Sequence, residues 1–406
     1  MRIILAHKYF KVGGGGDYYF FETKRILEEN GHAVAVFSTL DKDNEPTPYS
    51  DYFVEAPDFQ NPNMLKRVAS IGKIIYSLET KKNISRLISD FHPDIVHAFG
   101  IHSHLSPSLA DACSLNNVPL VLTCNDYKHI CPNYKLYHHN KICFDCRTGN
   151  YFHAILNRCC HDSMQFSIAN AMEAYVQKWA NLLRKNVHTF LFTSNFMAQT
   201  TELFWGKGNY RWKKIGNPYD SPSQKKSNEF GEYILYFGRF IEEKGVDVLM
   251  KAVQNIPNVK LKLVGNGPDE EALKQLMKDL RISNIELLGP RWGKDLDALL
   301  AQTRFVVVPS VWHENYPYVI LQSFAVGKPV IGTDRVGIPE LIQDRVTGLI
   351  CKGGDPGSLG RAIQELWNNP DECRTMGNAA KEFADMQFND QKYYRDLMEI
   401  YGEIVQ

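Results

Sequence analysis

Short apolar runs alternate along this chain with longer segments that have the hydrophobic spacing of helices, and this alternation restricts the fold more than any other feature. The first run, residues 2–6, is followed by a glycine-rich turn and by a helical pattern over residues 18–30 that Gly31 ends. Apolar runs of this length, each followed by a helix, are typical of buried parallel strands. The pattern therefore predicts an α/β protein whose parallel sheet is covered by helices.

The alternation occurs in two series with a break between them. Proline and polar residues cluster in the break, over residues 215–226. We therefore expect two doubly wound domains, residues 1–218 and 219–388, and an amphipathic helix within residues 389–406. The expected strands are residues 2–6, 33–37, 95–97, 120–123 and 189–192 in the first domain, and residues 233–237, 260–264, 285–287, 305–308 and 329–331 in the second.

The composition is that of ordinary globular domains. Of the 406 residues, 44% are hydrophobic and 23% are charged, which excludes a disordered chain and a small disulfide scaffold. The 46 Lys and Arg residues balance 46 Asp and Glu residues, and this neutrality excludes a dedicated nucleic-acid coat. Residues 1–218 nevertheless hold 24 basic and 19 acidic residues, against 22 and 27 in the remainder. We therefore expect the two domains to meet different partners.

No apolar run approaches the roughly 20 residues of a membrane span, and the apolar start of the chain is too short for a signal peptide. We therefore expect a cytoplasmic protein. In that compartment the nine cysteines are expected to be thiols or metal ligands rather than disulfides.

Two segments that follow predicted strands carry groups suited to a diphosphate. Glycines at residues 13–16 open a helix, where backbone N–H groups can approach an anion, although the adjacent Asp17 opposes simple phosphate affinity. In the second domain, Arg239 and Lys244 follow the first strand. A guanidinium fork and an ammonium charge can together hold phosphates, and the alternative is a pair of solvated surface charges.

A third segment, residues 309–317, follows the predicted strand 305–308. It combines aromatic residues and two prolines with a single carboxylate, Glu314. A carboxylate in such a loop at a strand end suggests recognition of hydroxyl groups. A helix is expected from Val319 onward, and it contains Gln322, eight residues after Glu314.

The ordered set of these motifs resembles the family 4 group of retaining glycosyltransferases, whose GT-B architecture consists of two Rossmann-like domains facing a cleft. The resemblance covers nearly the whole chain. The matching segments are the glycine loop with residues 31–34, Asn217-Pro218, Gly238-Arg239 with Lys244-Gly245-Val246, Gly265-Asn266-Gly267, Pro309-Ser310 with Glu314, Gly327-Lys328-Pro329-Val330, Thr333-Asp334 with Gly337-Ile338-Pro339-Glu340-Leu341, and Thr347-Gly348-Leu349.

The resemblance implies transfer of a sugar from a nucleotide-diphosphate sugar to a glycan or lipid-linked acceptor. It implies retention of the anomeric configuration, no catalytic metal, and a final helix that crosses back to the N-terminal domain. Arg239 and Lys244 are expected to hold the diphosphate and to stabilise the departing nucleotide, while Gly15 and Gly16 close on it from the other domain.

The same resemblance implies roles for the residues at and after Glu314. Glu314 itself is expected to contact the donor sugar. The positions expected beside the sugar and the phosphates are Asn315, Tyr316 and Val319.

Two positions depart from the family pattern. Where relatives carry a second glutamate for the ribose hydroxyls, this chain has Gln322, which keeps hydrogen bonds but loses the charge. Where relatives usually carry a histidine that contacts the sugar at the reaction centre, this chain has Asn125. Asn125 can hydrogen-bond a hydroxyl, but an amide does not titrate near neutral pH, so a general-base role there is excluded.

These departures leave a second hypothesis open, a degenerate GT-B scaffold that binds nucleotide and glycan without turnover. A third hypothesis is another GT-B enzyme, such as a phosphorylase or an epimerase. No segment matches the family of glycogen-type phosphorylases, which carry a pyridoxal-bearing lysine.

A cysteine-rich insert is expected over residues 129–161. Cys131, Cys143, Cys146 and Cys159 have the spacing C-x11-C-x2-C-x12-C, with Cys160 as an alternative ligand. A C-x2-C pair with two flanking cysteines fits a tetrahedral structural zinc, and the alternative is an insert with reduced, buried thiols. Several histidines lie among the cysteines as reserve ligands: His129, His138, His139, His153 and His161.

Two segments combine basic and apolar residues in a way that suits an anionic membrane surface. Residues 64–91 and 164–185 could each place a peripheral protein on the inner face of the membrane, or each could pack an apolar stripe on the core beneath a solvated basic face. The basic residues of the first segment are Lys66, Arg67, Lys73, Lys81, Lys82 and Arg86.

Overall fold

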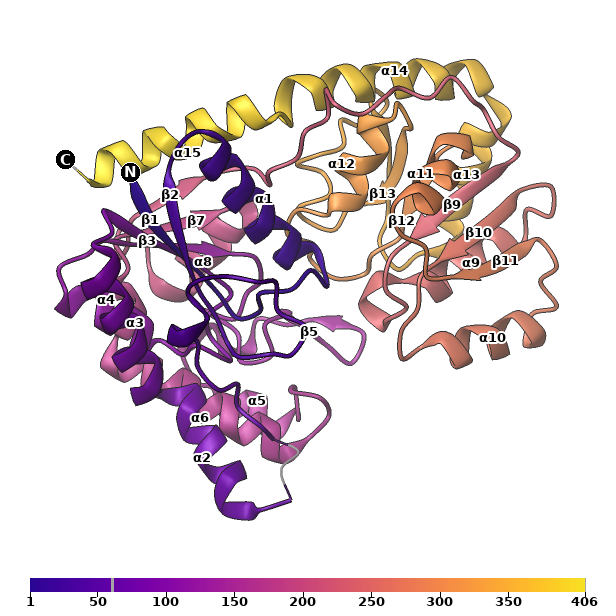
Figure 1. Cartoon of the computed structure of the whole chain (residues 1–406). Coiled ribbons are helices and arrows are strands. Elements are labelled where there is room, and N and C mark those ends of the chain that lie inside the picture. The colour runs from indigo at the N-terminus through magenta and orange to yellow at the C-terminus, as the bar shows by residue number, and fades with distance from the viewer. Residues whose placement is uncertain (60–61, 406) are drawn as a thin grey trace. The chain divides into compact units, whose positions relative to one another are not determined.

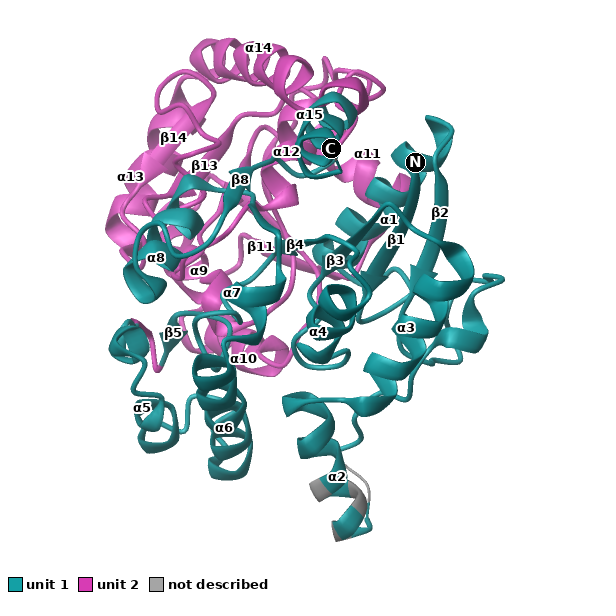
Figure 2. Ribbon diagram, turned by 90° about the vertical axis from the view of Figure 1, so that its left-hand side faces the viewer, with its two compact units in different colours: residues 1–138, 143–218, 393–406 teal, residues 139–142, 219–392 magenta. Residues whose placement is uncertain are grey.

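The computed structural model describes residues 1–59 and 62–405, without the side chains of residues 64, 66 and 68. The chain forms two compact units, shown in teal and magenta in Figure 2. Unit 1 contains Met1–His138, Cys143–Pro218 and Tyr393–Gln406. Unit 2 contains His139–Ile142 and Tyr219–Lys392.

Unit 1 is built on a six-stranded parallel sheet with the order β2-β1-β3-β4-β7-β8. The chain passes outward from β1 to β2 and then returns to β3 on the other side of β1. In doubly wound sheets, ligands bind beyond the carboxyl ends of the strands at such a reversal. The strands are β1 (Arg2–His7), β2 (Ala33–Phe37), β3 (Ile95–Phe99), β4 (Leu120–Cys124), β7 (Thr189–Phe192) and β8 (Trp212–Lys214).

Different helices cover the two faces of this sheet. Because side chains alternate along a strand, Ile4 of β1 points to one face and Ile3 to the other. The first face packs on α3, α4 and α8, and the second packs on α1 and α15 (Figure 1). These helices are α1 (Gly15–Glu29), α3 (Leu78–Phe91), α4 (Ser108–Leu115), α8 (Asn195–Trp205) and α15 (Asp390–Ile404).

The C-terminal helix α15 packs on the sheet of unit 1. Its amphipathic spacing places the apolar residues on one side of the helix, and this side is buried. Leu397 and Tyr401 are fully buried in the cluster that contains Ile3. The Tyr401 hydroxyl bonds His97 Nδ1 at 2.6 Å, so the polar tip of this buried ring has a partner.

Irregular structure follows β4. A two-stranded sheet, β5 (Tyr137–His138) and β6 (Lys141–Ile142), is followed by the 3₁₀ turn η2 (Asp145–Thr148). Residues of this segment form a small cluster of their own, Cys146, Tyr151, Ala154 and Ala171. The remaining elements of this part of the chain are η1 (Ser50–Tyr52), α2 (Met64–Ile75), α5 (Phe152–Leu156), α6 (Met164–Ala180) and α7 (Leu182–Asn186), and α2 contacts α6.

Unit 2 repeats the architecture with a six-stranded parallel sheet in the order β11-β10-β9-β12-β13-β14. Here the order reverses between β9 and β12, which are neighbours in the sheet. The strands are β9 (Tyr233–Phe237), β10 (Lys260–Val264), β11 (Ile285–Gly289), β12 (Val306–Val308), β13 (Val330–Thr333) and β14 (Gly348–Cys351).

The core of unit 2 packs one face of this sheet on α9 and α13. Ile234 of β9 is fully buried with Leu249 of α9 and Ile363 of α13. The helical elements of unit 2 surround this sheet in Figure 1. They are η3 (Glu242–Lys244), α9 (Val246–Gln254), α10 (Glu270–Asp279), α11 (Lys294–Gln302), α12 (Tyr318–Ala325), α13 (Pro356–Asn368) and α14 (Pro370–Gln387).

The predicted fold class, two Rossmann-like parallel-sheet domains, is confirmed. Several strand ends differ from the expected ones by one or two residues, and three larger details differ as well. The edge strands β8 and β14 are not marked by long apolar runs, and the first helix begins at Gly15 instead of residue 18. Within the described residues, no helix combines the length and the apolarity needed to cross a bilayer.

Candidate functional site

The predicted donor residues of unit 2 lie beyond the carboxyl ends of β9 and β12, at the reversal of the strand order. Gly238 and Arg239 follow β9, and the loop that contains Glu314 follows β12. Because neighbouring parallel strands end at the same edge of a sheet, two loops 70 residues apart in sequence meet there. This edge is where the fold favours a ligand.

The two loops are joined through their backbones. The Val311 amide donates to the Glu243 carbonyl at 3.0 Å. Gly245 has φ +65°, and a Cβ there would lie 2.3 Å from the Pro309 carbonyl oxygen. Only glycine permits both this conformation and this approach at little cost, so Gly245 sets the distance between the loops.

Lys244 and Glu314 form an ion pair at this junction. Lys244 Nζ lies 2.6 Å from Glu314 Oε1, and it also lies 5.8 Å from the centre of the Trp312 ring. Glu314 is 5% exposed, whereas the Lys244 side chain is 26% exposed. The carboxylate is therefore buried beneath a cation that still reaches solvent.

Glu314 has a second partner that sequence analysis missed as a site residue. The buried Ser310 hydroxyl donates to Glu314 Oε1 at 2.6 Å, and Thr333 Oγ1 donates to the Ser310 carbonyl at 2.7 Å. Burial raises the pKa of Glu314, but the charge of Lys244 and the hydrogen bonds from Lys244 and Ser310 outweigh it, so the net pKa is lowered. The only sequence signal for Ser310 was its place four residues before Glu314 in the same loop.

Arg239 stands at the rim of the same edge with an exposed side chain. The buried Tyr236 hydroxyl donates to the Arg239 carbonyl at 2.8 Å and fixes the backbone that carries the guanidinium. Gly265 lets the loop after β10 approach this backbone, because a Cβ on Gly265 would lie 1.8 Å from the Gly238 carbonyl oxygen. The Arg239 side chain is thus exposed to solvent, while its backbone is anchored.

The other predicted donor residues lie on the chain that follows Glu314. Asn315 and Tyr316 are half-buried in the loop, and burial raises the pKa of the Tyr316 phenol. Val319 and Gln322 are half-buried on α12. Gly337 packs against the loop, since a Cβ there would lie 2.0 Å from the Glu314 carbonyl oxygen.

In unit 1, Gly15 and Gly16 form the first turn of α1, directly after the loop that follows β1. The helix has no side-chain cap at Gly14. Asp17 instead folds back on the loop, where its carboxylate accepts hydrogen bonds from the Gly13 and Gly14 amides, and burial raises the pKa of Asp17 against the effect of these bonds. These amides are thus able to bind an anionic oxygen.

Asn125 follows β4 and lies beside the glycine turn. A Cβ on Gly16 would stand 3.7 Å from Asn125 Nδ2, an ordinary contact distance. The structure therefore brings Asn125 and Gly16 together within unit 1, and it brings Lys244 and Glu314 together within unit 2.

The four cysteines predicted as zinc ligands, Cys131, Cys143, Cys146 and Cys159, lie in the insert, and burial raises the pKa of each thiol. Among the described residues, the group of metal-ligating atoms within 4.8 Å of one another consists of His138, Cys143 and Asp145, so Cys143 is the one predicted ligand that it contains. Of the reserve ligands, His129 is engaged elsewhere, with its Nε2 2.7 Å from Thr201 Oγ1.

In the basic segment of residues 64–91, two lysines form ion pairs with acidic residues of the protein itself. Lys73 Nζ lies 2.9 Å from Glu79, and Lys81 Nζ lies 2.6 Å from Asp111. The predicted basic residue Lys66 has a side chain outside the described residues. These ion pairs favour packing on the core over a membrane face for this segment.

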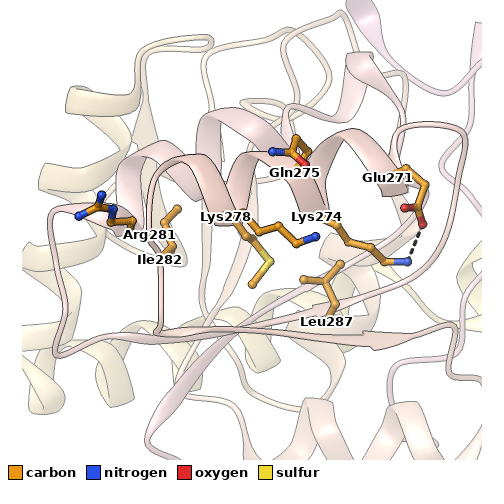
Figure 3. Close-up of a pocket in the computed structure, with 8 residues that line it drawn as sticks. Glu271, Lys274, Gln275, Lys278, Arg281, Ile282 and Leu287 are labelled. Atoms are coloured by element: carbon orange, nitrogen blue, oxygen red, sulfur yellow. Dashed lines mark hydrogen bonds and ion pairs between the residues drawn. The ribbon is translucent and has the colours of Figure 1, made fainter.

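A groove elsewhere in unit 2 does not belong to these sites. Figure 3 shows it between α10 and β11, lined by Glu271, Lys274, Lys278 and Leu287 among others. Lys274 pairs with Glu271 at 2.7 Å at its rim. None of the predicted site residues lines it.

Comparison with known proteins gives the chain a family. Residues 13–220, about half of the chain, match the model of Glycosyltransferase Family 4. Residues 220–383 match the model of Glycosyl transferases group 1. Together the two matches cover most of both units and every predicted donor residue.

Curated relatives match part of the chain. An uncharacterized glycosyltransferase of Methanocaldococcus jannaschii is 32% identical over 170 residues, 42% of this chain and 48% of the relative. The lipopolysaccharide core biosynthesis glycosyltransferase LpsE of Rhizobium meliloti is 33% identical over 154 residues, 38% of this chain and 42% of the relative. The chain thus spans about half or less of the length of these relatives.

Solved structures match over nearly the full length. HepE of Anabaena in complex with UDP has a TM-score of 0.68 at 17% identity, with 99% of this chain and 100% of that chain covered. Sucrose-phosphate synthase from Thermosynechococcus elongatus has a TM-score of 0.75 at 17% identity, with coverage of 100% and 99%. These likenesses show the fold, and the family models show the membership: the chain belongs to glycosyltransferase family 4 and has the GT-B fold.

Proposed function

We propose that the protein transfers a sugar from a nucleotide-diphosphate sugar to a glycan or lipid-linked acceptor, with retention of configuration and without a catalytic metal. The observation that carries this proposal is the Lys244–Glu314 pair at the strand-order reversal of unit 2. It joins a partly exposed cation to a buried carboxylate at the edge where such folds bind ligands. A diphosphate needs the first group, and sugar hydroxyls need the second.

The pair suggests how the donor is received. Without donor, Lys244 neutralises Glu314. When a diphosphate enters, the Lys244 ammonium can turn part of its three donors toward phosphate oxygens, and Arg239 can add a bidentate contact from the rim. Ser310 keeps its hydrogen bond to Glu314 during this change, so the carboxylate stays ionised and oriented toward a sugar hydroxyl.

The same cations explain why the proposal needs no metal. In the transfer step the bond between the sugar and the diphosphate breaks, a bond to the acceptor oxygen forms, and negative charge grows on the departing nucleotide. Arg239 and Lys244 place two positive charges where that charge develops, which is the electrostatic role a divalent cation fills in other enzymes.

Unit 1 is proposed to supply the remaining contacts. The backbone amides at Gly15 and Gly16 would donate to the diphosphate, and Asn125, beside Gly16, would hydrogen-bond the transferred sugar. Because Asn125 cannot accept a proton near neutral pH, its contribution is positional.

Several solved structures with a similar fold suggest which nucleotide to test first. HepE of Anabaena was solved with UDP and with UDP-glucose, and TarM of Staphylococcus aureus with UDP. We therefore propose a uridine diphosphate sugar as the first donor to test. A thermal-shift screen of UDP, GDP, ADP and their sugars identifies the stabilising nucleotide, and acceptor-dependent release of that nucleotide then measures turnover.

A scaffold without turnover is the competing function, favoured by Asn125 and Gln322. It predicts nucleotide binding by calorimetry together with no nucleotide release for any donor, with or without glycan acceptors. Two results together support the enzyme hypothesis. The wild type releases nucleotide, and Gln322→Glu, which restores the family residue, binds nucleotide more tightly than the wild type.

We also propose that the acceptor side contacts an anionic membrane through α5 and α6. Phe152, Leu156, Met172 and Trp179 are between 50% and 76% exposed there, and Trp179 stands next to Lys178. Flotation with vesicles of anionic phospholipid is expected to carry the protein upward at low salt, and Trp179→Ser is expected to weaken it. Leu203→Ser, at a residue of α8 that is 55% exposed, is the control, and no flotation of the wild type would exclude the membrane contact.

A further inference from the structure

Three side chains of different chemistry meet beside the β5–β6 hairpin. A ligand atom of His138, one of Cys143 and one of Asp145 all lie within 4.8 Å of one another. His138 ends β5, Cys143 follows β6, and Asp145 begins the 3₁₀ turn η2. An imidazole nitrogen, a sulfur and a carboxylate oxygen are all common ligands of zinc. The hairpin thus gathers a mixed set of metal-ligating atoms.

The tight turn of the hairpin places His138 and Cys143 on one face. The two residues of the turn, His139 and Asn140, have φ of +46° and +59°, the left-handed values that a two-residue hairpin turn uses. His138 therefore stands opposite Lys141, and Cys143 lies two residues further along. Because side chains alternate along a strand, Cys143 lies on the face that carries His138.

Hydrogen bonds of the backbone hold both of these positions. The Cys143 amide donates to the Leu136 carbonyl at 2.8 Å, which fixes Cys143 in the hairpin. Asn133 Nδ2 donates to the Tyr137 carbonyl at 2.9 Å, directly before His138. The backbone that carries these two ligands is therefore set without the participation of a metal.

Asp145 is oriented from another part of the insert. Asn157, at the end of α5, donates from Nδ2 to Asp145 Oδ2 at 3.4 Å. The Asn157 amide itself donates to the His153 carbonyl at 3.0 Å, so this supporting residue is anchored. A hydrogen bond to one oxygen of a carboxylate leaves the other oxygen for a metal and sets its direction, as in the outer shell of many metal sites.

The charges of this group suit a divalent cation. An ionised thiol and a carboxylate this close repel one another, whereas a zinc ion attracts both. One thiolate, one carboxylate and a neutral imidazole balance the two positive charges of zinc. Because His138 and Cys143 are half-buried and Asp145 is exposed, a neutral assembly also avoids placing an uncompensated charge at a partly buried site.

The chemistry of the donors selects zinc among the common cations. Magnesium and calcium prefer oxygen ligands, while thiolate and imidazole together favour zinc. Bonds of about 2.0–2.3 Å in a tetrahedral zinc site place its ligand atoms roughly 3.3–3.8 Å apart. Small rotations of three side chains bring atoms that already lie within 4.8 Å to that spacing.

We propose that His138, Cys143 and Asp145 bind one zinc ion, with a water molecule as the fourth ligand. On binding, the Cys143 thiol releases its proton to solvent and its sulfur bonds the metal as a thiolate. The ion fastens the hairpin to η2. The site goes beyond the proposed transfer reaction and does not depend on it.

This ligand set differs from the one that the cysteine spacing predicts. Among the described residues, Cys131, Cys146 and Cys159 belong to no group of three metal-ligating atoms within 4.8 Å. Cys131 Sγ instead donates to Asn133 Oδ1 at 3.0 Å. The geometry therefore keeps Cys143 and replaces the other three predicted ligands with a histidine, a carboxylate and water.

Metal analysis of the full chain, purified without chelator, tests the site. About one zinc per chain is expected, and His138→Ala and Asp145→Asn are each expected to weaken zinc binding at least tenfold against a competing chelator. His153→Ala and Cys159→Ser, from the same insert, are the matched controls and are expected to keep the affinity of the wild type. No zinc in the wild type after addition of zinc ions, or an equal loss in Cys159→Ser, would overturn the proposal.

A second measurement uses the wild type and remains valid if a variant fails to fold. Replacing zinc with Co²⁺ is expected to give the absorption of a tetrahedral site that includes a thiolate band. The number of thiols that react with a thiol reagent is expected to rise by one when a chelator removes the metal, because Cys143 is the one cysteine of the set. A rise by three or more would show a cluster of thiolates and would overturn the mixed ligand set.

Discussion

Lys244 Nζ lies 2.6 Å from Glu314 Oε1, although the two residues are 70 positions apart in the chain. The contact forms because β9 and β12 are neighbours and their loops are joined by the Val311–Glu243 backbone hydrogen bond. A buried carboxylate without this cation would be strongly disfavoured, at a cost of about 3–5 kcal/mol if the partner were removed. The pair is therefore both a structural unit and the proposed receptor for the donor.

Ser310 is predicted to be a positioning residue for Glu314. Its hydroxyl lowers the pKa of Glu314, so Ser310→Ala is expected to raise that pKa and to move the acidic limb of the pH–rate profile to higher pH. Turnover at neutral pH is expected to fall about tenfold, in line with one lost hydrogen bond to a charged group. Ser323→Ala, which removes an equally buried hydroxyl from α12, is expected to leave the profile unshifted. Identical profiles for both variants would show that Ser310 does not position Glu314.

Lys328 is predicted to make stability rise with pH in the alkaline range. Burial lowers the pKa of Lys328 from 10.5 to about 8, so between these values the unfolded chain binds more protons than the folded chain. Lys328 therefore lowers the free energy of unfolding below about pH 8. This destabilisation decreases as the pH rises toward 10.5. Urea unfolding of wild type and Lys328→Met at several pH values checks this: the advantage of the variant, up to about 3 kcal/mol, is expected to shrink at high pH. A pH-independent difference would contradict it.

The helix α15 is predicted to be essential for the stability of unit 1. Leu397 is fully buried against the sheet, so Leu397→Ala is expected to cost about 2–5 kcal/mol of unfolding free energy. Glu399→Ala, on the exposed side of the same helix, is expected to change it by less than about 0.5 kcal/mol. Chemical denaturation measures both variants, and equal effects would mean that α15 does not stabilise unit 1 through its apolar stripe.

Asp17 is predicted to oppose diphosphate binding at the glycine loop, because its carboxylate lies on the Gly13 and Gly14 amides, directly before the Gly15 and Gly16 amides proposed to bind the diphosphate. Asp17→Asn is therefore expected to weaken this opposition and to tighten nucleoside-diphosphate binding several-fold in calorimetry. Asp43→Asn, at an exposed position of unit 1, is the control. Weaker binding by Asp17→Asn would show instead that the carboxylate orders the loop for the ligand.

The fold could be predicted from the sequence because strands buried on both faces of a parallel sheet are nearly continuous apolar runs. The predicted ends of two such strands agree with the observed ends, Tyr233–Phe237 and Lys260–Val264. Trp212–Lys214 could not be, because an edge strand with two lysines lacks that pattern. The start of α1 was placed too late because glycine has a low helix propensity, while in the structure Gly15 already has helical geometry.

The candidate site could be predicted only as far as its motifs. Glu314 and Lys244 were identified as separate donor residues, but their contact depends on which strands are neighbours, and a local pattern does not contain that information. Ser310 and the folded-back Asp17 were missed for a related reason, since their roles are set by where their side chains point. The zinc site predicted from the C-x2-C spacing stays a prediction, because the group of close metal-ligating atoms in the described residues is His138, Cys143 and Asp145.

The most direct test of the account is the rate of acceptor-dependent nucleotide release from the stabilising donor, measured for the wild type, Lys244→Ala, Glu314→Gln and Lys251→Ala. Lys251 is the matched control, because it forms an exposed pair with Asp247 on α9. The account predicts turnover by the wild type and by Lys251→Ala, and a loss of about 100-fold or more in kcat/KM for Lys244→Ala and Glu314→Gln with folded proteins. Wild-type rates in Lys244→Ala and Glu314→Gln, or no release by the wild type with any donor, would contradict it.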